Sequence, residues 1–118
     1  MPTFPFFKNE PDVRTIPANQ VIFVEGQPAD ALMYAVLEGE VEIVRKEHVL
    51  ETIPAGGVFG EMALLDQQPR SATARAKTDC RVAVITEKRF TVLASQNPHF
   101  ALDMMRLLVE RVRHNLAS

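Results

Sequence analysis

The chain of 118 residues has little of what marks several large classes of protein. Its one cysteine, Cys80, cannot form an internal disulfide; an apolar run beside it predicts a buried thiol, and such cysteine usage is typical of a reducing compartment. The formal net charge is only −2, which argues against a broad nucleic-acid surface. No apolar run approaches the ~20 residues of a membrane helix, and the short, proline-broken start lacks the basic flank of a signal peptide. We therefore expect a soluble, cytoplasmic protein with neither a nucleic-acid nor a membrane partner.

Groups of catalytic or metal-binding side chains are lacking as well. His48, His99 and His114 are scattered along the chain, without the spacing that metal sites use. No Ser/His/Asp or Cys/His arrangement is visible in the sequence. The sequence therefore favours a protein that is not an enzyme, and it predicts neither a metal nor a cofactor.

What the chain does contain is a succession of short β-branched and apolar runs separated by turn residues. This pattern is typical of a β-sandwich or β-barrel, and the length is that of a single domain, expected over 1–118. Residues 6–13 are expected to form a short helix or an arm over one end of the core. The expected strands, before and after a glycine-rich stretch, are 20–24, 32–37, 41–44, 49–53 and 81–85.

Two helices are expected at the end of the chain. Thr86 is the expected N-cap of the first, which should end near Ala94. Asn97 is expected to cap the last helix, with Pro98 at its first position and an end near residue 117.

The last helix has an unusually wide apolar surface. A partial second stripe of Phe100, Leu107 and Val109 leaves it with more to bury than one sheet face can cover. Arg106, Arg111 and Arg113 are predicted to be solvated charges. The main apolar face, at helical spacing, comprises Ala101, Met104, Met105, Leu108, Val112 and Leu116.

The most informative stretch runs from Gly56 to Ala76 and reads GGVFGEMALLDQQPRSATARA. Its glycines allow a tight loop, the run 61–65 consists of good helix formers, and Pro69 lies just beyond the expected helix end. Free backbone N–H groups of this turn could receive a phosphate, and Arg70 could pair with it while Ser71 adds a hydroxyl. Glu61 has the wrong sign for a phosphate, so it should face a sugar hydroxyl. A ligand that carries both phosphate and ribose satisfies these groups.

The runs Phe59–Leu65 and Pro69–Thr73 resemble the phosphate-binding cassette of the cyclic nucleotide-binding domain family. This family includes catabolite-activator-type regulators, regulatory subunits of cyclic AMP-dependent kinase and cyclic nucleotide-gated channels. The likeness also takes in Phe23-x-x-Gly26, Met33-Tyr34 and Glu38-Gly39-Glu40-Val41, so it covers nearly the whole chain. It implies a mainly β fold: an eight-stranded, jelly-roll-like β-roll over about 14–86, a short cassette helix, and C-terminal helices over about 87–117.

The same resemblance implies a ligand site and a mechanism. Glu61 would accept a hydrogen bond from the ribose 2′-hydroxyl, and Arg70 would pair with the cyclic phosphate. The last helix, tied to the sheet only at Asn97-Pro98, would move or order over the base, and it could also form a homodimer. The full set of implied ligand-binding residues is Gly60, Glu61, Met62, Ala63, Arg70, Ser71 and Ala72.

The identity of the base follows from one position in this resemblance. Family members with threonine directly after the arginine prefer cyclic GMP, whereas this chain has Ser71. We therefore expect cyclic AMP rather than cyclic GMP as the ligand.

The alternative is a domain of this fold that no longer binds nucleotide and serves as a dimerisation or protein-docking module. Loss of the acid or the arginine would mark such a domain, and both Glu61 and Arg70 are present. Two departures from the family pattern bear on the affinity for nucleotide. No glycine precedes Pro69, and Gly57 stands at a position where an acidic residue is common in the family. The chain as given carries no DNA-reading helix-turn-helix, so we expect its output to pass through the dimer or through an unidentified protein effector.

Overall fold

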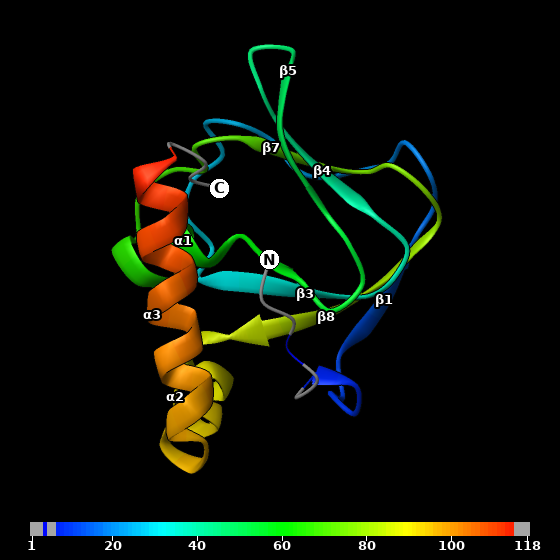
Figure 1. Cartoon of the computed structure of the whole chain (residues 1–118). Coiled ribbons are helices and arrows are strands. Elements are labelled where there is room, and N and C mark those ends of the chain that lie inside the picture. Colours follow the sequence, from blue (N-terminus) through cyan, green and yellow to red (C-terminus); the bar gives the residue numbers. More distant parts are fainter. Residues whose placement is uncertain (1–3, 5–6, 115–118) are drawn as a thin grey trace.

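The computed structural model describes residue 4 and residues 7–114, in which the strands form two antiparallel sheets (Figure 1). The first sheet has the order β1-β8-β3-β6, and the second has the order β2-β7-β4-β5. The predicted mainly β, eight-stranded fold is therefore confirmed. The strands are β1 (Val13–Ile16), β2 (Val21–Phe23), β3 (Leu32–Glu38), β4 (Val41–Arg45), β5 (His48–Ile53), β6 (Val58–Phe59), β7 (Thr73–Ala76) and β8 (Cys80–Thr86).

Three helices lie in the described part of the chain: α1 (Glu61–Asp66), α2 (Glu87–Gln96) and α3 (Pro98–Arg113). Thr86 caps α2 as predicted, since its hydroxyl accepts a hydrogen bond from the Arg89 amide at 3.1 Å. The predicted end of α3 near residue 117 falls on residues 115–118, which lie outside the described residues.

Asn97 corrects one prediction. It occupies the N-cap position of α3, but its side chain makes no hydrogen bond to that helix. Instead its Nδ2 donates to the Leu93 carbonyl at 3.3 Å, within the last turn of α2. The Leu93 carbonyl also accepts the backbone N–H of Asn97 at 2.9 Å, so the main chain and the side chain of Asn97 both close the last turn of α2.

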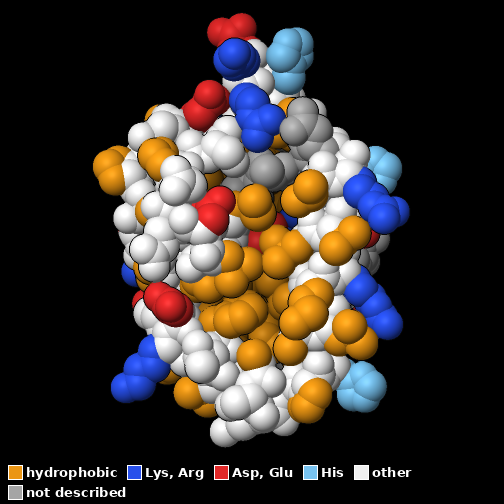
Figure 2. Space-filling model, turned by 90° about the vertical axis from the view of Figure 1, so that its left-hand side faces the viewer, with side chains coloured by type: hydrophobic (Ala, Val, Ile, Leu, Met, Phe, Trp, Pro, Cys, Tyr) orange, Lys and Arg blue, Asp and Glu red, His pale blue; other side chains and the backbone are white. Residues whose placement is uncertain are grey.

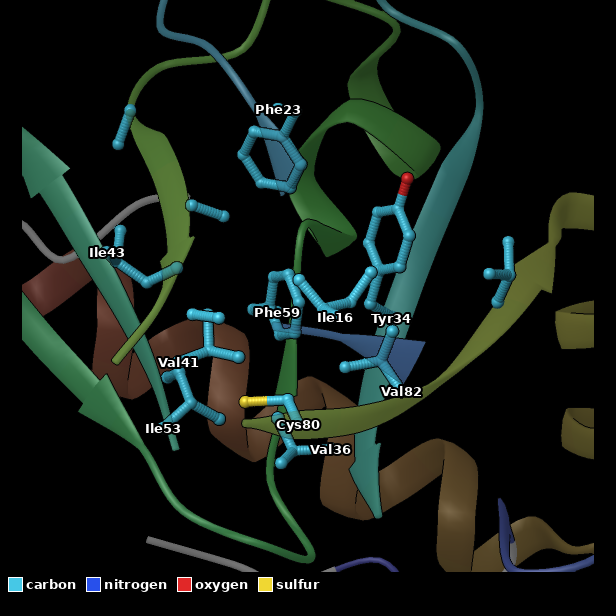
Figure 3. Close-up of a cluster of buried hydrophobic side chains, with 14 residues drawn as sticks. Ile16, Phe23, Tyr34, Val36, Val41, Ile43, Ile53, Phe59, Cys80 and Val82 are labelled. Carbon is cyan, nitrogen blue, oxygen red and sulfur yellow. The ribbon is translucent and has the colours of Figure 1, made fainter. Parts of the chain in front are cut away.

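One hydrophobic core fills the space between the two sheets (Figure 3). Along β4, Val41 and Ile43 are buried and Glu42 is not, which is the alternation of a strand with one face inward. Cys80 is also buried, as predicted, and its thiol donates to backbone carbonyls at 3.1 Å. At the end of this core nearest α1, three aromatic rings lie together, with Tyr34 and Phe59 stacked at 5.1 Å and Phe23 at 6.0 Å from Phe59.

A second core lies between the first sheet and the helices. Phe4 and Phe7 pack edge-on against Phe100 of α3, with ring centroids 5.8 and 5.6 Å apart. Glu10 accepts two hydrogen bonds from Arg89 of α2, both at 2.8 Å. The residues before β1 therefore cover this core, as predicted for the arm at 6–13, although Phe6 itself is outside the described residues. The α3 residues buried in this core are Phe100, Met104 and Leu107.

Two glycines with nearly equal backbone geometry allow a test of the packing. Gly26 and Gly39 have φ of +85° and +87°, in the left-handed region. An alanine Cβ would meet nothing within 4 Å at Gly26, but at Gly39 it would lie 2.3 Å from the Asp79 carbonyl oxygen. We expect Gly26→Ala to lower the free energy of unfolding by about 1–2 kcal/mol through backbone strain alone. Gly39→Ala should cost about 1–3 kcal/mol more through the added clash.

Urea denaturation of both variants measures the difference. Equal losses of stability would contradict the clash at Gly39.

Candidate functional site

The glycine-rich stretch folds as a strand, a sharp turn and one short helix. Gly60 has φ of +79° and occupies the N-cap position of α1. A Cβ at this position would lie 2.9 Å from Nη1 of Arg70, so glycine lets the guanidinium approach the backbone. The helix ends at Asp66, and Gln67 follows in the left-handed conformation at φ 57°. The predicted helix and its stop before Pro69 are therefore found in place.

Arg70 returns from beyond the helix to the turn that precedes it. Its side chain is fully buried, with Nη1 donating to the Gly60 carbonyl at 2.9 Å and Nη2 to the Leu32 carbonyl at 2.8 Å. Nη2 also pairs with the Asp30 carboxylate at 2.6 Å. The guanidinium lies 4.0 Å from the centroid of the Phe23 ring, and its Nε is buried with no hydrogen-bond partner. One donor of a buried cation is therefore unused.

Glu61, the residue after Gly60, is completely buried. Its Oε1 accepts a hydrogen bond from Nη1 of Arg111 in α3, whereas its Oε2 is buried without a partner. Burial raises the pKa of Glu61, and the charge and hydrogen bond of Arg111 oppose that rise. The carboxylate therefore has one satisfied oxygen and one available acceptor.

Arg111 corrects a second prediction, because it is not a solvated charge. Only 1 % of it is exposed. It pairs with Glu61 and with Glu51 of β5, and it donates to the Val58 carbonyl at 2.7 Å. Burial alone lowers the pKa of Arg111, but the two carboxylates outweigh it and raise the pKa. Arg106 and Arg113, by contrast, are exposed as predicted.

This ion-pair cluster overturns the expectation that the last helix is tied to the sheet only at Asn97-Pro98. Arg111 holds the far end of α3 to β5, to β6 and to the start of α1 through charge-assisted hydrogen bonds. The core contacts of Phe100, Met104 and Leu107 hold the rest of the helix. α3 is thus docked along its length.

The remaining predicted site residues lie around the same turn. Gly60, Ala63 and Ala72 are buried, while Met62 and Ser71 are partly exposed. The Ser71 carbonyl accepts a hydrogen bond from Nε of Arg45 at 2.9 Å. The structure thus brings the turn, the helix start and the Arg70 segment together. Two cavities, of about 510 and 380 Å³, are lined by other residues, such as Lys8 and Arg81 in the first and Met105 and Arg113 in the second.

The roles of three charged residues in this cluster, Asp30, Glu51 and Arg111, were not predicted from the sequence. Asp30 pairs with Arg70, Arg111 pairs with Glu61, and Glu51 pairs in turn with Arg111. The three residues come from a loop, a helix and a strand that are distant in sequence. A signal existed for Arg111 alone: it follows Phe100, Met104 and Leu107 at helical spacing, so it continues the buried stripe of α3. For Asp30 and Glu51 the sequence carries no such pattern.

Within residue 4 and residues 7–114, no three His, Cys, Asp or Glu side chains gather in a way that could hold a metal ion. None of the described helices combines the length and the apolar character needed to cross a membrane.

The sequence and the fold were compared with known proteins. A family model described as "Cyclic nucleotide-binding domain" matches residues 13–97. The chain is 36 % identical over 98 residues to a cyclic nucleotide-gated potassium channel of Rhizobium etli. The aligned region covers 83 % of this chain and 27 % of the channel. It is 32 % identical over 118 residues to the cAMP-activated global transcriptional regulator CRP of Escherichia coli, covering 95 % of this chain and 56 % of that regulator.

The fold also resembles that of a solved structure. The Catabolite Activator Protein of Thermus thermophilus superposes with a TM-score of 0.80 at 30 % identity, over 88 % of this chain and 51 % of that protein. The chain thus spans about half or less of the length of these proteins. A family match over residues 13–97, together with these identities, assigns the chain to the family of cyclic nucleotide-binding domains.

Proposed function

We propose that this chain, a single domain over 1–118, is a sensor that binds a cyclic nucleotide, cyclic AMP in preference to cyclic GMP, and signals through α3. The cyclic phosphate pairs with Arg70, and the ribose 2′-hydroxyl donates to Glu61. Backbone groups at Gly60, Met62, Ala63 and Ala72 and the Ser71 hydroxyl complete the site. The chemistry is binding, without a catalytic step.

The observation that carries this proposal is a pair of unsatisfied atoms at one turn. Nε of Arg70 is a buried donor without a partner, and Oε2 of Glu61 is a buried acceptor without a partner. Both residues belong to the turn at Gly60, since Arg70 bonds the Gly60 carbonyl and Glu61 is the next residue along the chain. Buried polar groups are normally paired, so a ligand with an anionic group and a hydroxyl donor would satisfy the turn.

The proposed preference for cyclic AMP rests on Ser71. Family members that prefer cyclic GMP have a threonine at this position, directly after the arginine. The CRP relative, whose name describes it as cAMP-activated, supports the same choice.

Arg111 couples the candidate site to α3. Glu61 and Arg70 are buried, and Arg111 of α3 bonds directly to Glu61. A nucleotide that binds at this turn can therefore bias the position of α3, to the extent that it binds one position better than another. The position of α3 becomes the signal that a protein effector could read.

The alternative is a docking module that has lost nucleotide binding. In that case the unpaired atoms of Arg70 and Glu61 would lower the stability of the fold without serving a ligand. Titration with nucleotide separates the two functions.

Arg70→Ala should weaken binding of cyclic AMP by about 2–4 kcal/mol, because it removes a buried charge-assisted partner of the phosphate. Isothermal titration calorimetry with cyclic AMP and with cyclic GMP measures the loss and ranks the two bases. Arg75→Ala is the matched control: Arg75 lies on the neighbouring strand β7, is 41 % exposed and pairs with Glu42 at 3.8 Å. Absence of heat for both nucleotides with the unaltered protein would favour the docking module instead.

We further propose that α3 forms a homodimer with a second copy of the chain. Four large apolar side chains remain exposed along α3. A broad apolar area is visible on the face of the molecule shown in Figure 2. The spacing of the four side chains is three, four and three residues, which is the spacing of a coiled-coil contact. The four residues are Leu102, Met105, Val109 and Val112, with 41–62 % of each exposed.

The charges beside this stripe favour a parallel pair of helices. Arg106 and Arg113 follow Met105 and Val112 along one edge, whereas the other edge carries Ala101 and Leu108. In a parallel pair each arginine edge faces the apolar edge of the partner, over which the long arginine stems can pack. In an antiparallel pair the two arginine edges would face each other and repel. A second copy in parallel orientation is therefore the occupant that suits this face.

Val109→Glu should convert the dimer into a monomer, because it places two like charges in the centre of the contact. Sedimentation equilibrium of the unaltered protein and of the variant measures the mass. Val49→Glu is the control, since Val49 lies on β5 and is similarly exposed, at 49 % against 53 % for Val109. A monomeric mass for the unaltered protein at high micromolar concentration would refute the dimer.

A further inference from the structure

The hydrogen bonds of Arg111 are divided unequally between two carboxylates. Glu51 takes two of them in parallel, from Nε to Oε1 and from Nη2 to Oε2, both at 3.2 Å. Nη2 also donates to the Val58 carbonyl. Glu61 receives one hydrogen bond, from Nη1 to its Oε1. The two-pronged contact that a guanidinium usually makes with a carboxylate is thus given to Glu51.

This division leaves Glu61 with a buried oxygen that has no partner. Such an oxygen costs free energy, and Arg111 is the cation already bonded to the same carboxylate. Without another partner, the guanidinium of Arg111 would rotate and contact both oxygens of Glu61. It is held back because its Nε edge is occupied by Glu51, whose side chain is only 13 % exposed and therefore little weakened by water.

We propose that Glu51 is a positioning residue that keeps Arg111 on one oxygen of Glu61, so that the other oxygen remains the acceptor for the ribose 2′-hydroxyl. This inference rests on the proposed function, and it names the source of sugar selectivity at that site. Glu51 does not touch the hydroxyl in this scheme. It acts through Arg111, and its removal lets Arg111 occupy the acceptor that distinguishes a ribose from a 2′-deoxyribose.

The test compares cyclic AMP with 2′-deoxy cyclic AMP by isothermal titration calorimetry. The unaltered protein should prefer cyclic AMP by about tenfold or more, the usual effect of one hydrogen bond to a charged group. In Glu51→Leu this preference should fall to about twofold or less, as Arg111 closes the second oxygen. A preference in Glu51→Leu as large as in the unaltered protein overturns the inference. A merely structural role would weaken both nucleotides equally and leave the ratio unchanged.

The matched control is Glu42→Leu. Glu42 lies on β4, the strand next to β5, its side chain is 19 % exposed, and it pairs with Arg75 rather than with Arg111. The same substitution there should leave the preference for cyclic AMP at the value of the unaltered protein. Should Glu51→Leu fail to fold, Glu51→Gln keeps one acceptor and should give a preference between these two values. An unchanged preference in Glu51→Gln would then overturn the inference.

A crystal structure of the ligand-free Glu51→Leu variant, or of Glu51→Gln in its place, separates this inference from the proposed function. Contacts from Arg111 to both oxygens of Glu61 support it, whereas a contact to Oε1 alone overturns it, whatever the protein binds. Absence of nucleotide binding by the unaltered protein would refute the proposed function and, with it, the role in sugar selectivity, but not the positioning of Arg111.

Discussion

The burial of two guanidinium groups beside one turn is the constraint on which the arrangement of the site depends. A buried arginine must have acceptors for its donors, because an unpaired charge in the interior is very costly. Arg70 and Arg111 find these acceptors on β3 and the loop before it, on β5, on β6 and at the start of α1. Segments far apart in sequence are thereby fixed around Gly60, and α3 is docked to the same place.

The sequence predicted the parts of the site that local chemistry determines. The turn at Gly60, the short helix after it and the stop before Pro69 follow from glycine, helix formers and proline in the right order. The partners of Arg70 and Arg111 do not follow from local chemistry. Any acidic side chain can pair with a guanidinium, and the choice of Asp30 or Glu51 is made only when loops and strands come together in the fold.

The hairpin between β4 and β5 illustrates the same limit at the level of the backbone. The chain turns at Lys46 and Glu47, between the paired residues Arg45 and His48. Lys46 and Glu47 both have positive φ, 48° and 69°, a geometry that glycine and asparagine usually supply. The paired strands force it, because a two-residue turn between right-twisted strands needs this conformation. Here the pairing of β4 with β5 decides the turn, and the residue types of the turn do not.

The charge balance of the site indicates how an anionic nucleotide could bind under the proposed function. Two buried cations, Arg70 and Arg111, face three carboxylates, so the cluster has an excess of one negative charge. Adding a phosphate without another change would bury a second excess charge, which is unfavourable. The carboxylates of Glu61 and Glu51 are 0 % and 13 % exposed, whereas that of Asp30 is 31 % exposed and can turn to water at lowest cost. Under the proposed function, binding would therefore proceed most easily as an exchange, in which the phosphate replaces Asp30 as the anion paired with Arg70.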